Sequence, residues 1–192
     1  MAGLEFDRNE IYELIDKIIE RTMRMDMNWD WPCGVAYYGI SRAYETTGNE
    51  KYLNLMKDRV DEYMELGLPG WTVNTCAMGH CLITLYESTG EERYWETAMK
   101  KAEYLRKDAL RFGDSVLQHT VSQNNDFPEQ AWADTLFMAA FFLLRVGVKL
   151  KSEDIIHDAL NQWYWHIRYL QDAESWLWYH GYDNLAKNHM SG

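Results

Sequence analysis

Cysteine, proline and positive charge are all scarce in this sequence. It has three cysteines and three prolines in 192 residues, and its 30 acidic residues outnumber its 19 lysines and arginines. Cys33, Cys76 and Cys81 cannot all pair and form no CxxC motif, so we expect free buried thiols in a reducing compartment. The net charge of −11, with no basic block to offset it, argues against nucleic acid as a partner.

Long apolar runs and recognisable cofactor motifs are also missing. The apolar run Leu136–Leu144 is far shorter than the roughly 20 residues that a membrane span needs. Residues 1–20 are rich in charge and do not resemble a signal peptide. The six histidines show no HExxH spacing and no glycine-rich phosphate loop is present. We therefore predict a cytoplasmic protein with no membrane partner, no metal and no cofactor.

Helical periodicity dominates what is present, and no convincing alternating strand is found. Four segments carry an apolar stripe with charged residues opposite, which is typical of helices on the outside of a bundle. Three other segments are apolar on nearly every face, which predicts helices buried on all sides. The outer segments are Ile11–Thr22, Tyr52–Met64, Tyr94–Leu105 and Ile156–Ile167, and the inner ones are Val35–Tyr44, Val73–Tyr86 and Ala131–Val146.

An internal repeat supports this alternation of outer and inner helices. The segment from Tyr44, Tyr-Glu-Thr-Thr-Gly, recurs from Tyr86 as Tyr-Glu-Ser-Thr-Gly. Each copy predicts the end of an inner helix at a glycine in the left-handed conformation, at Gly48 and Gly90. A degenerate third copy is expected around Gly147. Such repeats indicate stacked helical hairpins.

The hairpins could form an open solenoid or a closed α/α toroid. Inner helices that are this uniformly apolar favour the toroid, so we predict an all-α fold with residues 1–192 as a single all-helical domain. The chain supplies about half of the hairpins that a closed ring needs, so the toroid is incomplete. We therefore expect exposed apolar edges and self-association through the incomplete core.

One carboxylate, Asp134, stands out because it lies in an otherwise apolar segment. The segment begins at Pro128, which suits a first helical residue, and follows the long polar stretch 111–127 with His119. A lone ionisable group among apolar residues is costly unless it is used, so Asp134 is the leading catalytic candidate. A carboxylate held by a buried hydrogen bond would leave the same pattern in the sequence.

Two further groups of residues could line a sugar site. His180 lies in the cluster Trp178–Asp183, which regular hairpin stacking places on the same rim as the stretch 111–127. Aromatic and polar residues also gather near the starts of the first two inner helices, where the mouth of a toroid is expected. These are Trp29, Trp31, Tyr37, Tyr38, Trp71 and Asn74. Such rings could equally fill the core.

Four motifs together resemble the unsaturated rhamnogalacturonyl hydrolases of glycoside hydrolase family 105, over the N-terminal half of a typical member. They are Trp31-Pro-Cys-Gly34, the two Tyr-Glu-[Thr/Ser]-Thr-Gly turns, Trp132-Ala-Asp-Thr-Leu-Phe-Met138 and Tyr179-His-Gly-Tyr-Asp183. The resemblance implies a six-hairpin α/α barrel. A Trp-Ala-Arg-Gly segment that usually follows is absent from this sequence, and with it a substrate-binding arginine and tryptophan.

The resemblance also implies a reaction on an unsaturated oligosaccharide substrate. Members remove a 4,5-unsaturated galacturonyl residue from pectin (rhamnogalacturonan) fragments by hydrating the enol-ether double bond. Asp134 matches the catalytic aspartate, and His180 matches a histidine of the substrate pocket. Trp132, within the same motif as Asp134, is a substrate-binding candidate. Tyr37, Tyr38, Asn74 and His119 are substrate-binding candidates from their positions alone. Two alternatives stay open: another α/α-toroid sugar enzyme, such as an epimerase, and a non-catalytic helical-repeat scaffold.

Overall fold

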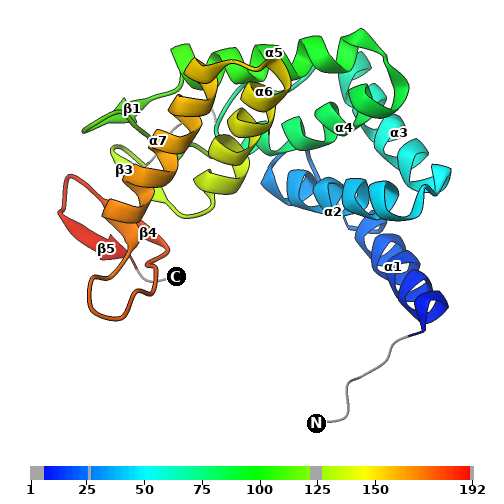
Figure 1. The fold of residues 1–192 in the computed structure, drawn as a ribbon, viewed down its shortest axis with the longest axis horizontal. Coiled ribbons are helices and arrows are strands. Elements are labelled where there is room, and N and C mark those ends of the chain that lie inside the picture. The colour runs from blue at the N-terminus through cyan, green and yellow to red at the C-terminus, as the bar shows by residue number, and fades with distance from the viewer. Residues whose placement is uncertain (1–6, 26, 122–126, 191–192) are drawn as a thin grey trace.

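The helices form an arc with α1 and α7 at its opposite ends (Figure 1). The structure is a computed structural model that describes residues 7–25, 27–121 and 127–190. A 3-10 helix, η1 (Asn74–Met78), leads into α4, and a π-helix, η2 (Leu136–Phe141), leads into α6. The α-helices are α1 (Arg8–Met23), α2 (Trp31–Thr47), α3 (Glu50–Leu66), α4 (Gly79–Thr89), α5 (Glu92–Lys107), α6 (Phe142–Leu150) and α7 (Glu153–Leu170). The predicted all-α, toroid-like class is confirmed.

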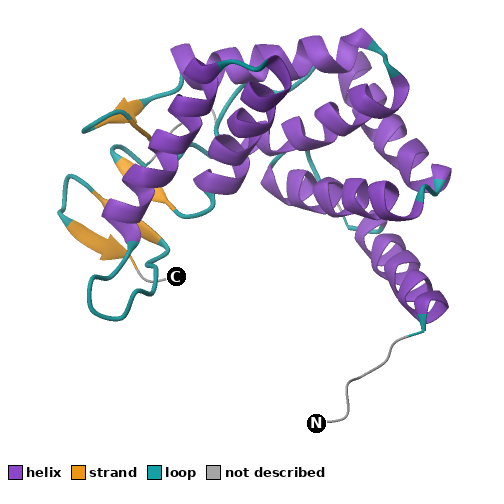
Figure 2. Cartoon of the chain, in the orientation of Figure 1, coloured by secondary structure: helices purple, strands orange, loops and turns teal. Residues whose placement is uncertain are grey.

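Five short strands are a difference from the expected purely helical chain, and they lie together beside α7 (Figure 2). β1 (Arg111–Phe112) pairs with β2 (Val116–Leu117) as a hairpin. A second sheet has the order β3-β4-β5, from Gln130–Trp132, Gly181–Asp183 and Asn188–Met190, with both pairings antiparallel. These strands have only two or three residues each, which is too short for an alternating pattern to show in the sequence.

The repeat behaves as predicted in its first two copies. Gly48 and Gly90 end α2 and α4 with φ angles of 67° and 72°, and their N–H groups bond back to the carbonyls of Tyr44 and Tyr86. The prediction for the third copy was wrong in detail. Gly147 lies inside α6, and the left-handed residue that ends this helix is Lys151, with φ 53°. A Cβ on Gly147 would lie 2.9 Å from Ile156 Cγ1. Gly147 therefore permits close packing of α6 on α7.

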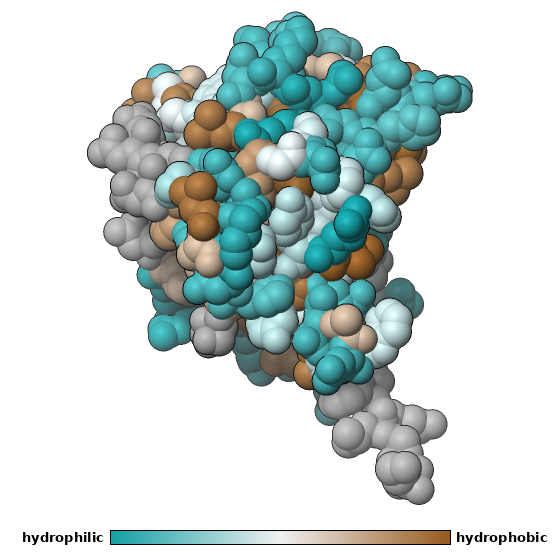
Figure 3. All heavy atoms as spheres, turned by 90° about the vertical axis from the view of Figure 1, so that its left-hand side faces the viewer, coloured by the Kyte–Doolittle hydropathy of each residue, from teal (hydrophilic) through white to brown (hydrophobic). Residues whose placement is uncertain are grey.

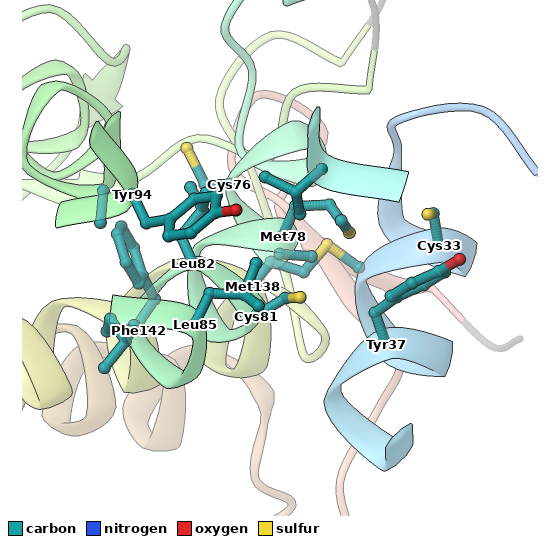
Figure 4. Packing of buried hydrophobic residues seen from close by; sticks show 14 of the residues in the cluster. Cys33, Tyr37, Cys76, Met78, Cys81, Leu82, Leu85, Tyr94, Met138 and Phe142 are labelled. Carbon is teal, nitrogen blue, oxygen red and sulfur yellow. The ribbon is translucent and has the colours of Figure 1, made fainter. Parts of the chain in front are cut away.

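The core lies between the middle helices, where the outer stripes of α3 and α5 turn inward as predicted. Met56, Val60, Ala98 and Leu105 are completely buried. Figure 4 shows core side chains from α4, such as Leu82, lying between neighbouring helices. The three free cysteines are all buried here, which confirms the expectation from their apolar neighbours.

The stripes of the two end helices turn inward only in part: Ile19 and Ala159 are buried, and the prediction was wrong for the residues that stay exposed. In α1, Leu14 and Ile18 are 55% and 57% exposed. In α7, Leu160 is 48% exposed, while the buried face carries Gln162 and His166. Apolar residues interrupt the hydrophilic surface on the side where α7 lies (Figure 3). Both end helices lack a neighbour on one flank, which leaves part of each stripe uncovered.

The inner helix predicted from Ala131 begins later than expected. Pro128 lies in a turn and residues 130–132 form β3, so the helical conformation starts only at Thr135. The backbone of β3 satisfies its hydrogen-bonding groups by pairing with β4, and this tertiary pairing overrides the local helical pattern. Asp134 therefore precedes the helix instead of lying within it.

Candidate active site

A cavity of about 430 Å³ opens beside the end of β3 and the start of η2. It brings together five of the seven residues proposed for the site. The lining residues are Trp31, Val35, Asn74, His119, Val121, Trp132, Asp134, Phe137, Met138 and His180. They come from α2, η1, β3, η2 and the segments before β3 and β4, so distant parts of the chain build one surface.

Asp134 occupies the turn between β3 and η2. Its backbone carbonyl accepts hydrogen bonds from the N–H groups of Phe137 and Met138, at 3.0 and 3.1 Å, which fixes the turn. Its side chain is 35% exposed, yet its Oδ1 atom is buried and has no hydrogen-bond partner within the part of the chain that the structure describes. A buried acceptor without a partner is uncommon in folded proteins and calls for an explanation. It does not match the alternative of a carboxylate held in a buried hydrogen bond.

His119 is the ionisable group nearest to Asp134 among the cavity residues. Its Nδ1 atom lies 3.4 Å from Asp134 Oδ1 and 3.0 Å from the hydroxyl of Thr135. Burial lowers the pKa of His119, the charge of Asp134 opposes that shift, and nearby His180 adds to it. A neutral imidazole beside the carboxylate can exchange a hydrogen bond with it without fixing it as a permanent ion pair.

Trp132 forms one wall of the cavity and is held between two histidines. The Trp132 and His119 rings stack with centroids 4.5 Å apart and planes 3° apart, and the His180 ring meets Trp132 edge-on with centroids 5.0 Å apart. Gln130 accepts a hydrogen bond from the indole Nε1 at 3.0 Å. The indole is therefore fixed in place by one hydrogen bond and by its ring contacts.

The β-sheet explains why His180 reaches this cavity from the far end of the sequence. The antiparallel pairing sets Trp132 opposite Gly181, and the N–H of Ala133 donates to the carbonyl of His180 at 2.9 Å. His180 is thereby held next to Trp132. The prediction that the cluster around His180 shares a rim with the stretch before β3 is confirmed by this placement.

Asn74 enters the cavity at the start of η1. Its N–H donates to the carbonyl of Thr120 at 3.2 Å, which ties η1 to the segment that carries His119. Its side-chain Oδ1 is buried and, like that of Asp134, has no partner among the described residues. Two unpartnered acceptors in one cavity are suited to a ligand rich in hydroxyl groups.

Two of the proposed binding residues are not brought to the cavity surface. Tyr37 is completely buried on the other side of α2, where its hydroxyl accepts a hydrogen bond from Arg59 at 3.4 Å (Figure 4). Tyr38 lies behind the wall, with its ring 5.3 Å from that of Phe137. Tyr37 is buried and Tyr38 is half-buried on another side of α2, but the sequence of this helix is apolar on most faces, so sequence position could not separate wall from core.

Sequence reasoning missed Val35, Val121, Phe137 and Met138 as cavity residues, because apolar wall and apolar core look alike in a sequence. Trp31 was among the aromatic residues noted near the start of the first inner helix, and it does line the cavity. Its companions Trp29 and Trp71 instead flank the buried ammonium of Lys101, at 5.4 and 5.7 Å. Among the described residues, no cluster of three or more His, Cys, Asp or Glu side chains is arranged to hold a metal ion.

The profile of Glycosyl Hydrolase Family 88 matches residues 5–192. The chain belongs to this family. The unsaturated rhamnogalacturonyl hydrolase YesR of Bacillus subtilis (strain 168) is 50% identical over 193 residues, which cover 100% of this chain and 56% of that protein. The family 88 chain thus spans little more than half the length of this relative.

Solved structures of similar fold agree with that assignment. A possible member of the GH105 family from Klebsiella pneumoniae superposes with a TM-score of 0.89 at 24% identity, over 98% of this chain and 55% of that one. A possible GH105 member from Salmonella enterica gives a TM-score of 0.88 at 25% identity, with the same coverage of 98% and 55%. The predicted resemblance to the unsaturated rhamnogalacturonyl hydrolases is confirmed at the level of family and fold.

Proposed function

We propose that this family 88 chain carries the catalytic aspartate of an unsaturated rhamnogalacturonyl hydrolase. The enzyme would remove a 4,5-unsaturated galacturonyl residue from rhamnogalacturonan fragments of pectin. The observation that carries the proposal is Asp134 Oδ1, a buried carboxylate oxygen that has no hydrogen-bond partner among the described residues and lies in a cavity walled by Trp132, His119 and His180. The 50% identity to a protein named for this activity supports the same reaction.

The chemistry needs one carboxyl group that acts first as an acid and then as a base. Protonated Asp134 gives its proton to C4 of the enol-ether double bond, and water adds its oxygen at C5. The carboxylate of Asp134 takes the proton that this water loses, so the residue returns to its starting state. The product is a hemiketal, which opens and releases the remaining sugar. No second carboxylate is required, and among the described residues that line the cavity Asp134 is the one carboxylate.

The other cavity residues have roles that follow from their chemistry. Trp132 lines the cavity and can pack against the planar, unsaturated ring, while Asn74 Oδ1 can accept a hydrogen bond from a sugar hydroxyl. His119 Nδ1, 3.4 Å from Asp134 Oδ1, can orient the carboxyl group towards C4. His180, at the edge of the Trp132 ring, can bond to the substrate at the mouth of the cavity.

The direct test is a continuous ultraviolet assay on an unsaturated galacturonyl-rhamnose disaccharide, following the loss of the conjugated double bond. We expect the parent chain to consume the double bond and Asp134→Asn to lose at least about 1000-fold in rate, because the amide cannot act as an acid. The near-isosteric amide should leave the unfolding transition in urea unchanged.

The controls separate this function from the two alternatives. Tyr37→Phe, which alters a hydroxyl remote from the cavity, should keep the rate of the parent. Equal rates for the parent and Asp134→Asn would contradict the assignment of Asp134. Epimerisation of a saturated sugar without loss of the double bond would favour an epimerase-like enzyme, and absence of any turnover would favour a scaffold.

We further propose a cytoplasmic location and self-association of the chain. The three buried free thiols support a reducing compartment, and no helix among the described residues is long and apolar enough to cross a membrane. The uncovered apolar residues of α1 and α7 support association with a second copy, because burying them removes apolar surface from water.

A further inference from the structure

One buried histidine outside the cavity touches the element that carries Asp134. His80, on α4, is completely buried, and its Nε2 atom lies 2.9 Å from the carbonyl oxygen of Phe137. Phe137 lines the cavity, and its N–H donates to the backbone carbonyl of Asp134. A single residue therefore connects His80 to the turn that presents the carboxylate.

The element between His80 and the turn at Asp134 is of a type that depends on contacts with its surroundings. Residues 136–141 form the π-helix η2, in which the hydrogen bonds span five residues instead of four. Such turns are rare, and they recur at functional sites. Its position directly after Asp134 makes the direction of the turn at Asp134 dependent on how η2 is held.

The hydrogen bonds around His80 define which of its ring nitrogens carries the proton. Arg145 can only donate, and its Nη1 lies 3.4 Å from Nδ1 of His80 and 3.1 Å from the His80 carbonyl oxygen. Nδ1 is therefore the acceptor, and Nε2 bears the hydrogen that is donated to Phe137. Burial lowers the pKa of His80 to about 4, so the ring stays neutral near pH 7.

The same contacts attach both η2 and α6 to α4. Phe137 lies near the start of η2, whereas Arg145 lies within α6 and reaches back to His80. The His80 ring is also packed between aromatic side chains, 4.7 Å from Phe137 and 4.9 Å from Phe141. Tyr38 closes the group, with its ring 5.2 Å from His80. Tyr38 thus belongs to this supporting group behind the cavity wall.

We propose that His80, fixed by Arg145, is a positioning residue for the Asp134 carboxylate. It holds the Phe137 carbonyl, and through it the turn at Asp134, so that the carboxyl group is directed into the cavity. The inference deepens the hydrolase proposed above and rests on it for its effect on rate. Its effect on the turn itself does not require the enzyme to be active.

A matched pair of polar substitutions isolates the decisive hydrogen bond. In His80→Gln the amide nitrogen takes the place of Nε2 and can donate to the Phe137 carbonyl. In His80→Asn the shorter side chain reaches only the place of Nδ1 and cannot. We expect kcat to fall about 10- to 100-fold in His80→Asn with KM changed less than about threefold, because the carboxylate is misplaced while the binding surface remains. We expect His80→Gln to recover most of kcat.

A second readout measures the turn directly, by amide hydrogen exchange at Phe137 and Met138. We expect faster exchange at these two amides in His80→Asn than in His80→Gln, relative to the other protected amides. Tyr52→Phe serves as a control for general destabilisation, since it removes a buried hydroxyl that bonds to Asp16 at 2.9 Å, far from η2. It should change neither kcat nor the exchange of these amides relative to the rest.

The possible results distinguish a failure of the role proposed for His80 from a failure of the proposed function. A parent chain that leaves the double bond intact would count against the hydrolase activity, while the exchange comparison would still decide the role of His80. Equal kcat and equal local exchange in the Asn and Gln variants would overturn the positioning role. A uniform rise of exchange at all amides in His80→Asn would also overturn it, because that would show only lost stability.

Discussion

The outer helices α5 and α7 have similar amphipathic sequences, but their apolar stripes differ in burial. The stripe of α5 is buried between neighbours, with Leu105 completely inaccessible to water. The corresponding stripe of α7 is partly open, with Leu160 48% exposed, while polar Gln162 is buried. Gln162 is satisfied there, since it accepts from the N–H of Leu117 at 2.8 Å and donates to the carbonyl of Ser115 at 2.9 Å.

The difference shows that periodicity identifies a helix but does not decide which face meets the core. α5 lies in the middle of the arc and has a neighbour on each flank, whereas α7 lies at its end (Figure 1). The β1–β2 hairpin packs on α7 and supplies backbone groups to its buried Gln162. An apolar stripe can be buried, and the neighbouring elements determine whether it is.

The sharpest way to test this comparison is to truncate one leucine on each helix. We expect Leu105→Ala on α5 to lower the free energy of unfolding by about 2–5 kcal/mol, because it leaves a cavity in the core. Leu160→Ala on α7 should change it by less than about 1 kcal/mol, since half of that side chain is already exposed. Urea unfolding of both variants measures the difference. The unfolding is measured at a protein concentration too low for self-association, where similar losses would contradict the difference in burial between the two stripes.

The buried histidine of α7 should also make the stability of the fold depend on pH. Burial lowers the pKa of His166 from 6.5 to about 4, and His80 has the same shift. The unfolded chain binds the proton more tightly, so this stability is present above pH 6.5 and is lost as pH falls towards 4. Each histidine should account for about 3 kcal/mol of that loss.

His166→Met and His80→Gln test this origin separately, in urea unfolding measured from pH 7 to pH 4. Each variant should have a shallower dependence of unfolding free energy on pH than the parent within this window. A pH dependence identical to that of the parent would show that neither imidazole is held neutral by the fold.

The smallest expected effect concerns association through the open stripe of α7. A positive charge in Leu160→Lys should weaken self-association about tenfold, because the charge would have to be desolvated in the interface. Leu66→Lys is the matched control, since Leu66 is also exposed, at 76%, but lies at the end of α3 and outside this stripe. Sedimentation equilibrium gives both dissociation constants. Equal weakening by the two variants would place the interface elsewhere, and a parent that stays monomeric would contradict the proposal.

Part of the candidate site was predicted from the sequence. The residues that were predicted wrongly or missed have a common cause. Asp134, Trp132 and His180 carry chemistry that is unusual in an apolar helical sequence, and all three line the cavity. Tyr37 and Tyr38 were indistinguishable from binding residues because the sequence of α2 is apolar on most faces. The roles of His80 and Arg145 gave no signal, since they depend on a carbonyl at Phe137 that only the fold brings near.

The sequence by itself determined the alternation of helices, the glycine ends of α2 and α4, and the presence of one exceptional carboxylate. These features depend on residues close together in the chain, through periodicity, capping and the cost of burying charge. Tertiary structure decided where η2 starts, which face α7 buries and that Asp134 and His180 line the same cavity. Those outcomes depend on β3 pairing with β4 and on the position of each helix in the arc, which local sequence does not encode.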